Sequence, residues 1–199
     1  MLLDVAVPHV IDYPVVLTSL QSAGLKCVYP NSGAFGLAPA CTQHVIGWAC
    51  EDDPTIRPQA RAALRIVLDH PLPALLSRAW RHHLPGPLWL MPASHWAYEL
   101  QFGSADWLPS LLSEHGIDPE SLRPRADGSA IEFASGEADS FLALVQKLFT
   151  QVIASDLTVA FPGRPVVALL HHHHQIWWQT SDLAIWKSLD SVAISSSSP

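Results

Sequence analysis

Four consecutive histidines interrupt an apolar stretch late in the chain, in the segment LLHHHHQIWWQT (169–180). Alternate residues of a strand share a face, so His171 with His173, or His172 with His174, would present two imidazoles to one ion. A third ligand has to come from another element, and two histidines with a carboxylate suit zinc or ferrous iron. The candidates for that third ligand are His82, His83, His95 and Glu99.

The same histidines also fit a site without metal. In that interpretation they act as acid–base or hydrogen-bonding groups, and Trp177 or Trp178 forms an apolar wall of a ligand cleft. The two tryptophans are adjacent, so on a strand they face opposite sides and only one can line the cleft. A purely structural interpretation is the third alternative: the histidines form a polar, partly exposed bulge or tight loop, and the tryptophans pack in the core.

The backbone geometry at the histidines is the unusual feature of this segment. Residues 165–180 are too many for one strand of ordinary length, so the chain is expected to bend at the histidine run. A hairpin turn normally contains Gly, Asn, Asp or Pro, and none of these lies between Val166 and Thr180. A β-bulge, which re-aims side chains without reversing the strand, is therefore the alternative to a hairpin.

A second group of polar residues lies in the segment MPASHWAYE (91–99), where Ser94 and His95 are followed by Glu99. A serine beside a histidine suggests a nucleophile and a base, but the members of a catalytic triad normally come from distant positions in the sequence. The motif of the common serine-hydrolase elbow, G-x-S-x-G, is absent from the sequence. Packing or cleft residues are the favoured interpretation of this segment.

The elements that must position these residues follow from hydrophobic periodicity. Helices are predicted at 14–23, 73–83, 105–115, 138–153 and 182–189, and residues 58–68 favour a helix, with a strand over ALRIVL as the alternative. Strands are predicted at 25–29, 44–49, 87–91, 96–102, 129–134, 157–162, 165–170 and 175–180. This order predicts a mixed α/β fold, with α+β as the alternative. Its mixed sheet carries packed helices, and the chain ends in a β-meander over 157–180 and a C-terminal helix.

Length and composition predict a single globular domain over 1–190, followed by a frayed, serine-rich tail at 191–199. The chain has 199 residues, of which 49% are hydrophobic and 15% charged, and this composition is sufficient to bury one core. Most of the eight tryptophans are expected in the core or in cleft walls. The apolar composition is also compatible with a homo-oligomer.

Charge and cysteine usage restrict the partners and the compartment. A formal net charge of −7 with dispersed Lys and Arg argues against nucleic acid, and no apolar window approaches the length of a membrane span. The N-terminal segment MLLDVAVPHVIDYP lacks a basic region, so a signal peptide is not expected. Three cysteines without scaffold spacing predict buried thiols rather than disulfides, and a cytoplasmic location is expected.

Two functional hypotheses follow, and the sequence does not decide whether the protein is an enzyme. The first is a small-molecule or ion-binding domain with a cleft lined by His and Trp side chains. The second is a metal-assisted hydrolase that uses histidines of the 171–174 run and a divalent zinc, iron or manganese ion. The candidate residues of the cleft are His95, Glu99, His171, His172, His173, His174, Trp177 and Trp178.

Overall fold

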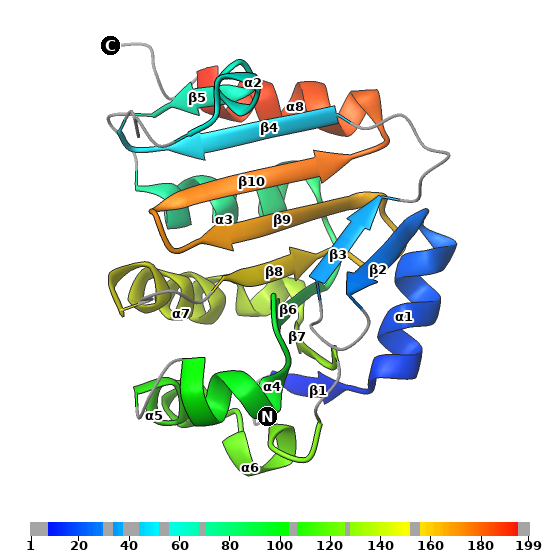
Figure 1. Cartoon of the computed structure of the whole chain (residues 1–199), viewed down its shortest axis with the longest axis vertical. Helices are drawn as coiled ribbons and strands as arrows, with labels where there is room; N and C mark the ends of the chain where they lie inside the picture. The colour runs from blue at the N-terminus through cyan, green and yellow to red at the C-terminus, as the bar shows by residue number, and fades with distance from the viewer. Residues whose placement is uncertain are drawn as a thin grey trace, which may run out of the picture.

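The computed structural model describes residues 8–29, 34–37, 44–51, 56–67, 71–103, 107–125, 128–151 and 156–194. These residues form the predicted mixed α/β fold, in which helices pack on a large sheet (Figure 1). The strands of this sheet lie in the order β1-β7-β6-β8-β9-β10-β4-β5, and a separate two-stranded sheet pairs β2 with β3. Adjacent strands of the large sheet are antiparallel, except that β4 and β5 are parallel.

The bounds of the elements are as follows. The strands of the large sheet are β1 (His9–Ile11), β4 (His44–Ala49), β5 (Leu64–Ile66), β6 (Leu88–Pro92), β7 (Ala130–Phe133), β8 (Leu157–Ala160), β9 (Val166–His171) and β10 (Gln175–Thr180). The small sheet consists of β2 (Leu25–Tyr29) and β3 (Ala34–Leu37). The helices are α1 (Tyr13–Ser22), α2 (Pro58–Arg61), α3 (Leu72–His83), α4 (Trp96–Tyr98), α5 (Trp107–Glu114), α6 (Pro119–Leu122), α7 (Ala138–Gln151) and α8 (Leu183–Ile194), with a π-helix η1 (Glu99–Gly103) and a 3-10 turn η2 (Ser135–Glu137).

Both faces of the large sheet are covered. Side chains alternate along β6, where Leu88 and Leu90 join the core formed with α3, α7 and α8. Trp89 and Met91 alternate with these leucines along the strand, so they face the other side of the sheet and join a smaller core under α1. In Figure 1, the β2–β3 sheet lies in front of the large sheet with α1 beside it at the right, and α3 and α8 lie behind the large sheet. This burial on two sides explains why β6 is apolar throughout, with all five residues buried.

The predicted meander and C-terminal helix are confirmed. Strands β8, β9 and β10 follow one another in the chain and are neighbours in the sheet, and α8 comes next. The turn between β8 and β9 contains Gly163 at φ 74°, a left-handed conformation that glycine adopts without steric cost. The meander brings the end of β9 and the start of β8 to the same edge of the sheet, since Leu157 pairs with Leu170.

The strand predicted at 96–102 is wrong, because this segment is the short helix α4 followed by the π-helix η1. Trp96 and Leu100 are four residues apart and both are buried, which is the spacing of one helical face. His95 caps α4, because its Nδ1 accepts a hydrogen bond from the backbone N–H of Tyr98 at 3.0 Å. The Trp96 indole N–H donates to the carbonyl of Ser129 at 2.6 Å and fixes this turn against β7.

Several short elements were not predicted, namely β1, β3 and α6, and the ambiguous region 58–68 contains both α2 and β5. The C-terminal helix continues to Ile194, and Val192 and Ala193 are buried, so the folded chain extends four residues beyond the expected boundary at 190. Residues 195–199 of the predicted tail lie outside the described residues. Among the described residues, no helix has both the length and the apolar character needed to span a bilayer.

Candidate metal site at the β9–β10 turn

The histidine run forms the turn of a β-hairpin. His171 ends β9 and pairs with Gln175 at the start of β10, so the loop contains only the three residues between them. Hairpin loops of three residues place their last residue in the left-handed region, and His174 adopts φ 56°. Histidine is more tolerant of this region than most non-glycine residues. The hairpin, rather than the bulge, is therefore the geometry of this segment, although the turn lacks Gly, Asn and Asp.

The turn gathers three imidazole rings. The ring centroids of His171 and His172 lie 4.3 Å apart, and those of His172 and His173 lie 4.4 Å apart. One potential ligand atom from each of the three residues lies within 4.8 Å of the other two. His171 and His173 therefore lie together, as alternate strand residues would, but the turn also adds His172 to the group. His174 points elsewhere and its ring stacks on Phe149, with centroids 6.2 Å apart.

Asp156, immediately before β8, orients the ring of His172. Its Oδ1 accepts a hydrogen bond from the backbone N–H of His172 at 3.0 Å and lies 2.7 Å from Nδ1 of the same residue. An ionised carboxylate only accepts hydrogen bonds, so Nδ1 carries the proton and Nε2 carries the lone pair. The other carboxylate oxygen lies 3.9 Å from Nε2 of His171. The imidazole of His172 is thus held in the tautomer that offers Nε2 to a metal ion.

The cluster is accessible from solvent. The side chains of His171 and His172 are 25% and 30% exposed, that of Asp156 is 22% exposed, and His173 is more exposed than His171 and His172. The backbone N–H of His173 donates to Nδ1 of His171 at 3.2 Å, so the lone pair of this nitrogen is engaged in a hydrogen bond within the turn and binds an ion only when that bond is exchanged. The three rings therefore lie at a surface that an ion can reach without any opening of the fold, and His171 joins as a ligand by exchanging its hydrogen bond for the ion.

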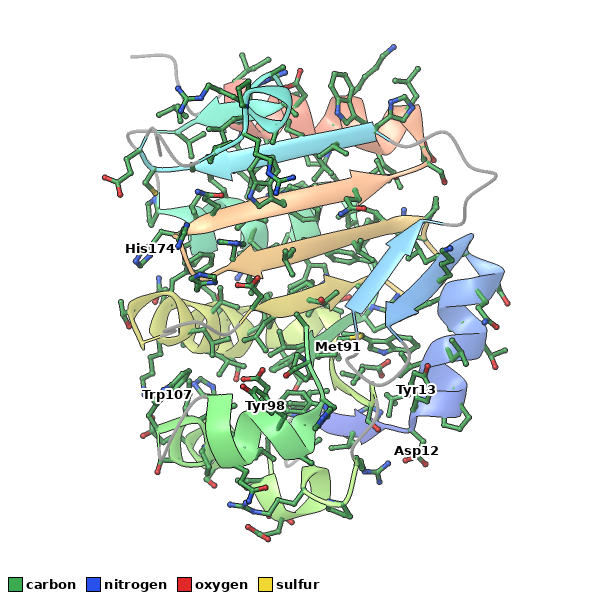
Figure 2. The ribbon with its side chains drawn as sticks, viewed as in Figure 1. Asp12, Tyr13, Met91, Tyr98, Trp107 and His174 are labelled. Carbon is green, nitrogen blue, oxygen red and sulfur yellow. The ribbon has the colours of Figure 1, made fainter. Side chains whose placement is uncertain are left out.

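Two hollows flank the hairpin turn. The smaller has a volume of about 10 Å³, room for about one water molecule, and is bounded by Leu148, Phe149, Leu157, Leu170, His171 and His172. The larger is an apolar cleft of about 280 Å³. It is lined by Cys50, Pro71, Leu72, Pro73, Gln146, Phe149, Thr150 and His174. Phe149 belongs to both walls, and Figure 2 shows His174 at the tip of the β9–β10 turn.

The two tryptophans of the segment do not line either hollow. Trp178 is completely buried in the core on the helix face of the sheet, where its ring packs 5.1 Å from that of Trp48. Trp177 lies on the opposite face, pairs with Gly47 across the strands and donates its indole N–H to Gln175 at 2.7 Å. The cleft beside the histidines is instead closed by helices α3 and α7, which the sequence did not connect with this site.

His95 and Glu99 lie near the same edge of the sheet but do not join the group of three histidines. The backbone N–H of Ala93 donates to the carbonyl of Asp156 at 2.8 Å, which fixes the start of this segment beside the site. Glu99 is 3% exposed and accepts a hydrogen bond from the hydroxyl of Ser94. Within the described part of the chain, neither belongs to the cluster of ligand atoms around the turn.

His82 and His83 lie at the C-terminal end of α3, whereas the N-terminal end of this helix lines the cleft. The 12 residues of α3 span about 18 Å, so these two histidines are remote from the turn. Burial lowers the pKa of His83, and the neighbouring charges of His82 and Arg78 lower it further. Their position explains why they do not supply a third ligand.

Sequence reasoning missed Asp156, Phe149 and the exposed thiol of Cys50 as parts of the site. A signal for Asp156 existed, because a residue directly before β8 must lie beside the end of β9 in a meander. Cys50 follows β4 and is exposed, in contrast to the buried thiol that was expected. No protein-family model, curated protein or solved structure matches this chain.

Proposed function

We propose that the β9–β10 turn binds one divalent transition-metal ion through the imidazoles of His171, His172 and His173, and that the protein is a metal-ion-binding protein. The observation that carries this proposal is the clustering of three ligand nitrogens within 4.8 Å of one another. Ligands of a tetrahedral zinc ion lie about 2.0–2.1 Å from the metal and hence about 3.4 Å apart. Binding therefore requires the partly exposed rings to rotate toward one another, with His171 exchanging its hydrogen bond from the His173 backbone for the ion.

The donor set favours zinc over manganese. Three imidazoles are borderline-soft nitrogen ligands, which suit zinc, copper and nickel, whereas manganese prefers oxygen. Asp156 acts on the ring of His172 and not as a member of the group, so the two-histidine and carboxylate arrangement is the less favoured one. A carboxylate that orients a metal-binding histidine is a common feature of zinc sites and increases the basicity of the ligand.

The test is a zinc titration of the untagged chain, purified without nickel resin and followed by isothermal titration calorimetry. We expect one zinc ion per chain. His173→Ala should weaken binding by more than the 10- to 100-fold that the loss of an outer-shell partner costs. His82→Ala is the matched control, since it removes another exposed histidine, outside the cluster, and should leave zinc affinity unchanged. Equal affinity of the two variants would refute the proposal.

A metal-assisted hydrolase is the second candidate, and the number of ligands favours it. Catalytic zinc sites use three protein ligands and keep one position for water, whose pKa the metal lowers to about 7. The apolar cleft beside the turn offers space for a substrate. Hydrolysis of 4-nitrophenyl acetate that depends on zinc and disappears in His173→Ala would support this activity. Stoichiometric zinc binding without turnover would exclude the hydrolase and leave metal-ion binding as the function.

A further inference from the structure

The cleft between α3, α7 and the end of β4 has the walls of a small ligand pocket. Leu72 and Pro73 are buried at its base, Phe149 is half-buried at its side, and polar groups of Gln146 and Thr150 lie at its exposed rim. Its volume of about 280 Å³ lies just below the range of about 300–1,000 Å³ found for drug-sized ligands. An occupant is therefore a small molecule with an apolar body.

The cleft and the proposed metal site are adjacent. His174 lines the cleft and directly follows His173 in the chain. Phe149 separates the two spaces, since one part of its side chain faces the hollow at His171 and another faces the cleft. A short molecule that lies against Leu72 and Phe149 and passes His174 at the tip of the turn would place its other end at the metal.

The net charge of the proposed metal site indicates which chemical group of the bound molecule contacts the metal. A zinc ion carries two positive charges, and the three neutral imidazoles add none. Asp156, which contacts His171 and His172, supplies one negative charge. One positive charge stays in excess at an ion whose fourth position no protein ligand fills in a three-histidine site. A carboxylate satisfies both the charge and the open position.

We propose that the cleft binds a monocarboxylate with a short apolar chain, whose carboxylate ligates the metal and whose chain lies against Leu72 and Phe149. This inference rests on the proposed zinc site. Hexanoate is the probe, acetate is the matched ligand without the chain, and hexan-1-ol is the matched ligand without the charge. The exposed thiol of Cys50 lines the same cleft and reports its occupation through its rate of alkylation by iodoacetamide, read from the peptide that contains it.

The experiment uses the full chain with zinc bound, after zinc stoichiometry has been measured separately. Each buried methylene increases affinity about fourfold, so hexanoate should bind at least tenfold more tightly than acetate and should slow alkylation of Cys50. Thr150→Phe fills the rim of the cleft and should remove this advantage without changing zinc affinity. Ser22→Phe is the control, because Ser22 is exposed at the end of α1, whose buried residues belong to the smaller core and not to the core that contains Leu72.

Six results would overturn the inference. Equal affinities of hexanoate and acetate, or unchanged alkylation of Cys50, would show that the cleft does not hold the chain, while the zinc site would stand. Hexan-1-ol binding as tightly as hexanoate, or hexanoate binding equally without zinc, would show that the metal does not hold the carboxylate. An unchanged affinity in Thr150→Phe would place the ligand elsewhere. Absence of zinc binding would remove the proposed function and this inference together.

Discussion

Replacement of Asp156 by alanine should weaken both the hairpin turn and the proposed metal site. The carboxylate Oδ1 accepts from the backbone N–H and from Nδ1 of His172, at 3.0 and 2.7 Å, and so ties the turn to the start of β8. Without it the imidazole is free to rotate and to change tautomer. The ring then no longer presents Nε2 to the ion in one fixed direction.

The magnitudes follow from these two hydrogen bonds. A hydrogen bond contributes about 1 kcal/mol net, and one to a charged group about 1.5–3 kcal/mol. The side chains of Asp156 and His172 are 22% and 30% exposed, so water replaces part of what is lost. We expect the free energy of unfolding to fall by about 1–2 kcal/mol. Zinc affinity should fall 10- to 100-fold, equivalent to about 1.4–2.7 kcal/mol.

The assay is urea unfolding without metal, followed by calorimetric zinc titration of the same protein. Asp156→Asn keeps an oxygen acceptor but loses the charge, and its zinc affinity should lie between those of the parent and the alanine variant. Asp139→Ala is the control for charge, because Asp139 is 91% exposed at the start of α7. An alanine variant of Asp156 that binds zinc as tightly as the parent would refute the reasoning.

Three further predictions concern the sheet, the turn and pH. Gly47→Ala should lower the free energy of unfolding by about 1–3 kcal/mol, because an added Cβ would lie 2.6 Å from the Trp177 ring. Urea unfolding measures this loss, which should be largely absent when Gly47→Ala is made in a Trp177→Ala background. His174→Gly should raise the free energy of unfolding by about 0.5–1 kcal/mol, since glycine removes the left-handed strain at φ 56°, and calorimetry should show unchanged zinc affinity. Burial lowers the pKa of His83 and His115 from 6.5, so as the pH falls these two histidines bind protons in the unfolded chain before they do so in the folded one. The free energy of unfolding should therefore fall as the pH drops below about 6.5. A double variant of both residues to Gln should show a flatter dependence of urea midpoint on pH between 7.5 and 5.5, and an equal slope would contradict the assignment.

The fold class was predictable because each element is encoded in local periodicity. Apolar residues at three- and four-residue steps define α7, and apolar or β-branched runs define β6, β8, β9 and β10, whatever the rest of the chain does. The segment 96–102 shows where this fails. Its apolar residues fit a strand and one helical face equally well. The side-chain contacts of His95 and Trp96 with Tyr98 and Ser129 decided for the helix.

The sequence by itself determined that four histidines interrupt an apolar meander, and that the chain must bend there. Only the tertiary structure decided which of them meet, because a tight hairpin with left-handed His174 gathers His171, His172 and His173, whereas an extended strand separates them into alternate pairs. The partners of the site come from further away. Asp156 reaches His172 through the pairing of β8 with β9, and Cys50 enters the cleft because β4 pairs with β10. Such contacts depend on strand order and register, which local periodicity does not encode.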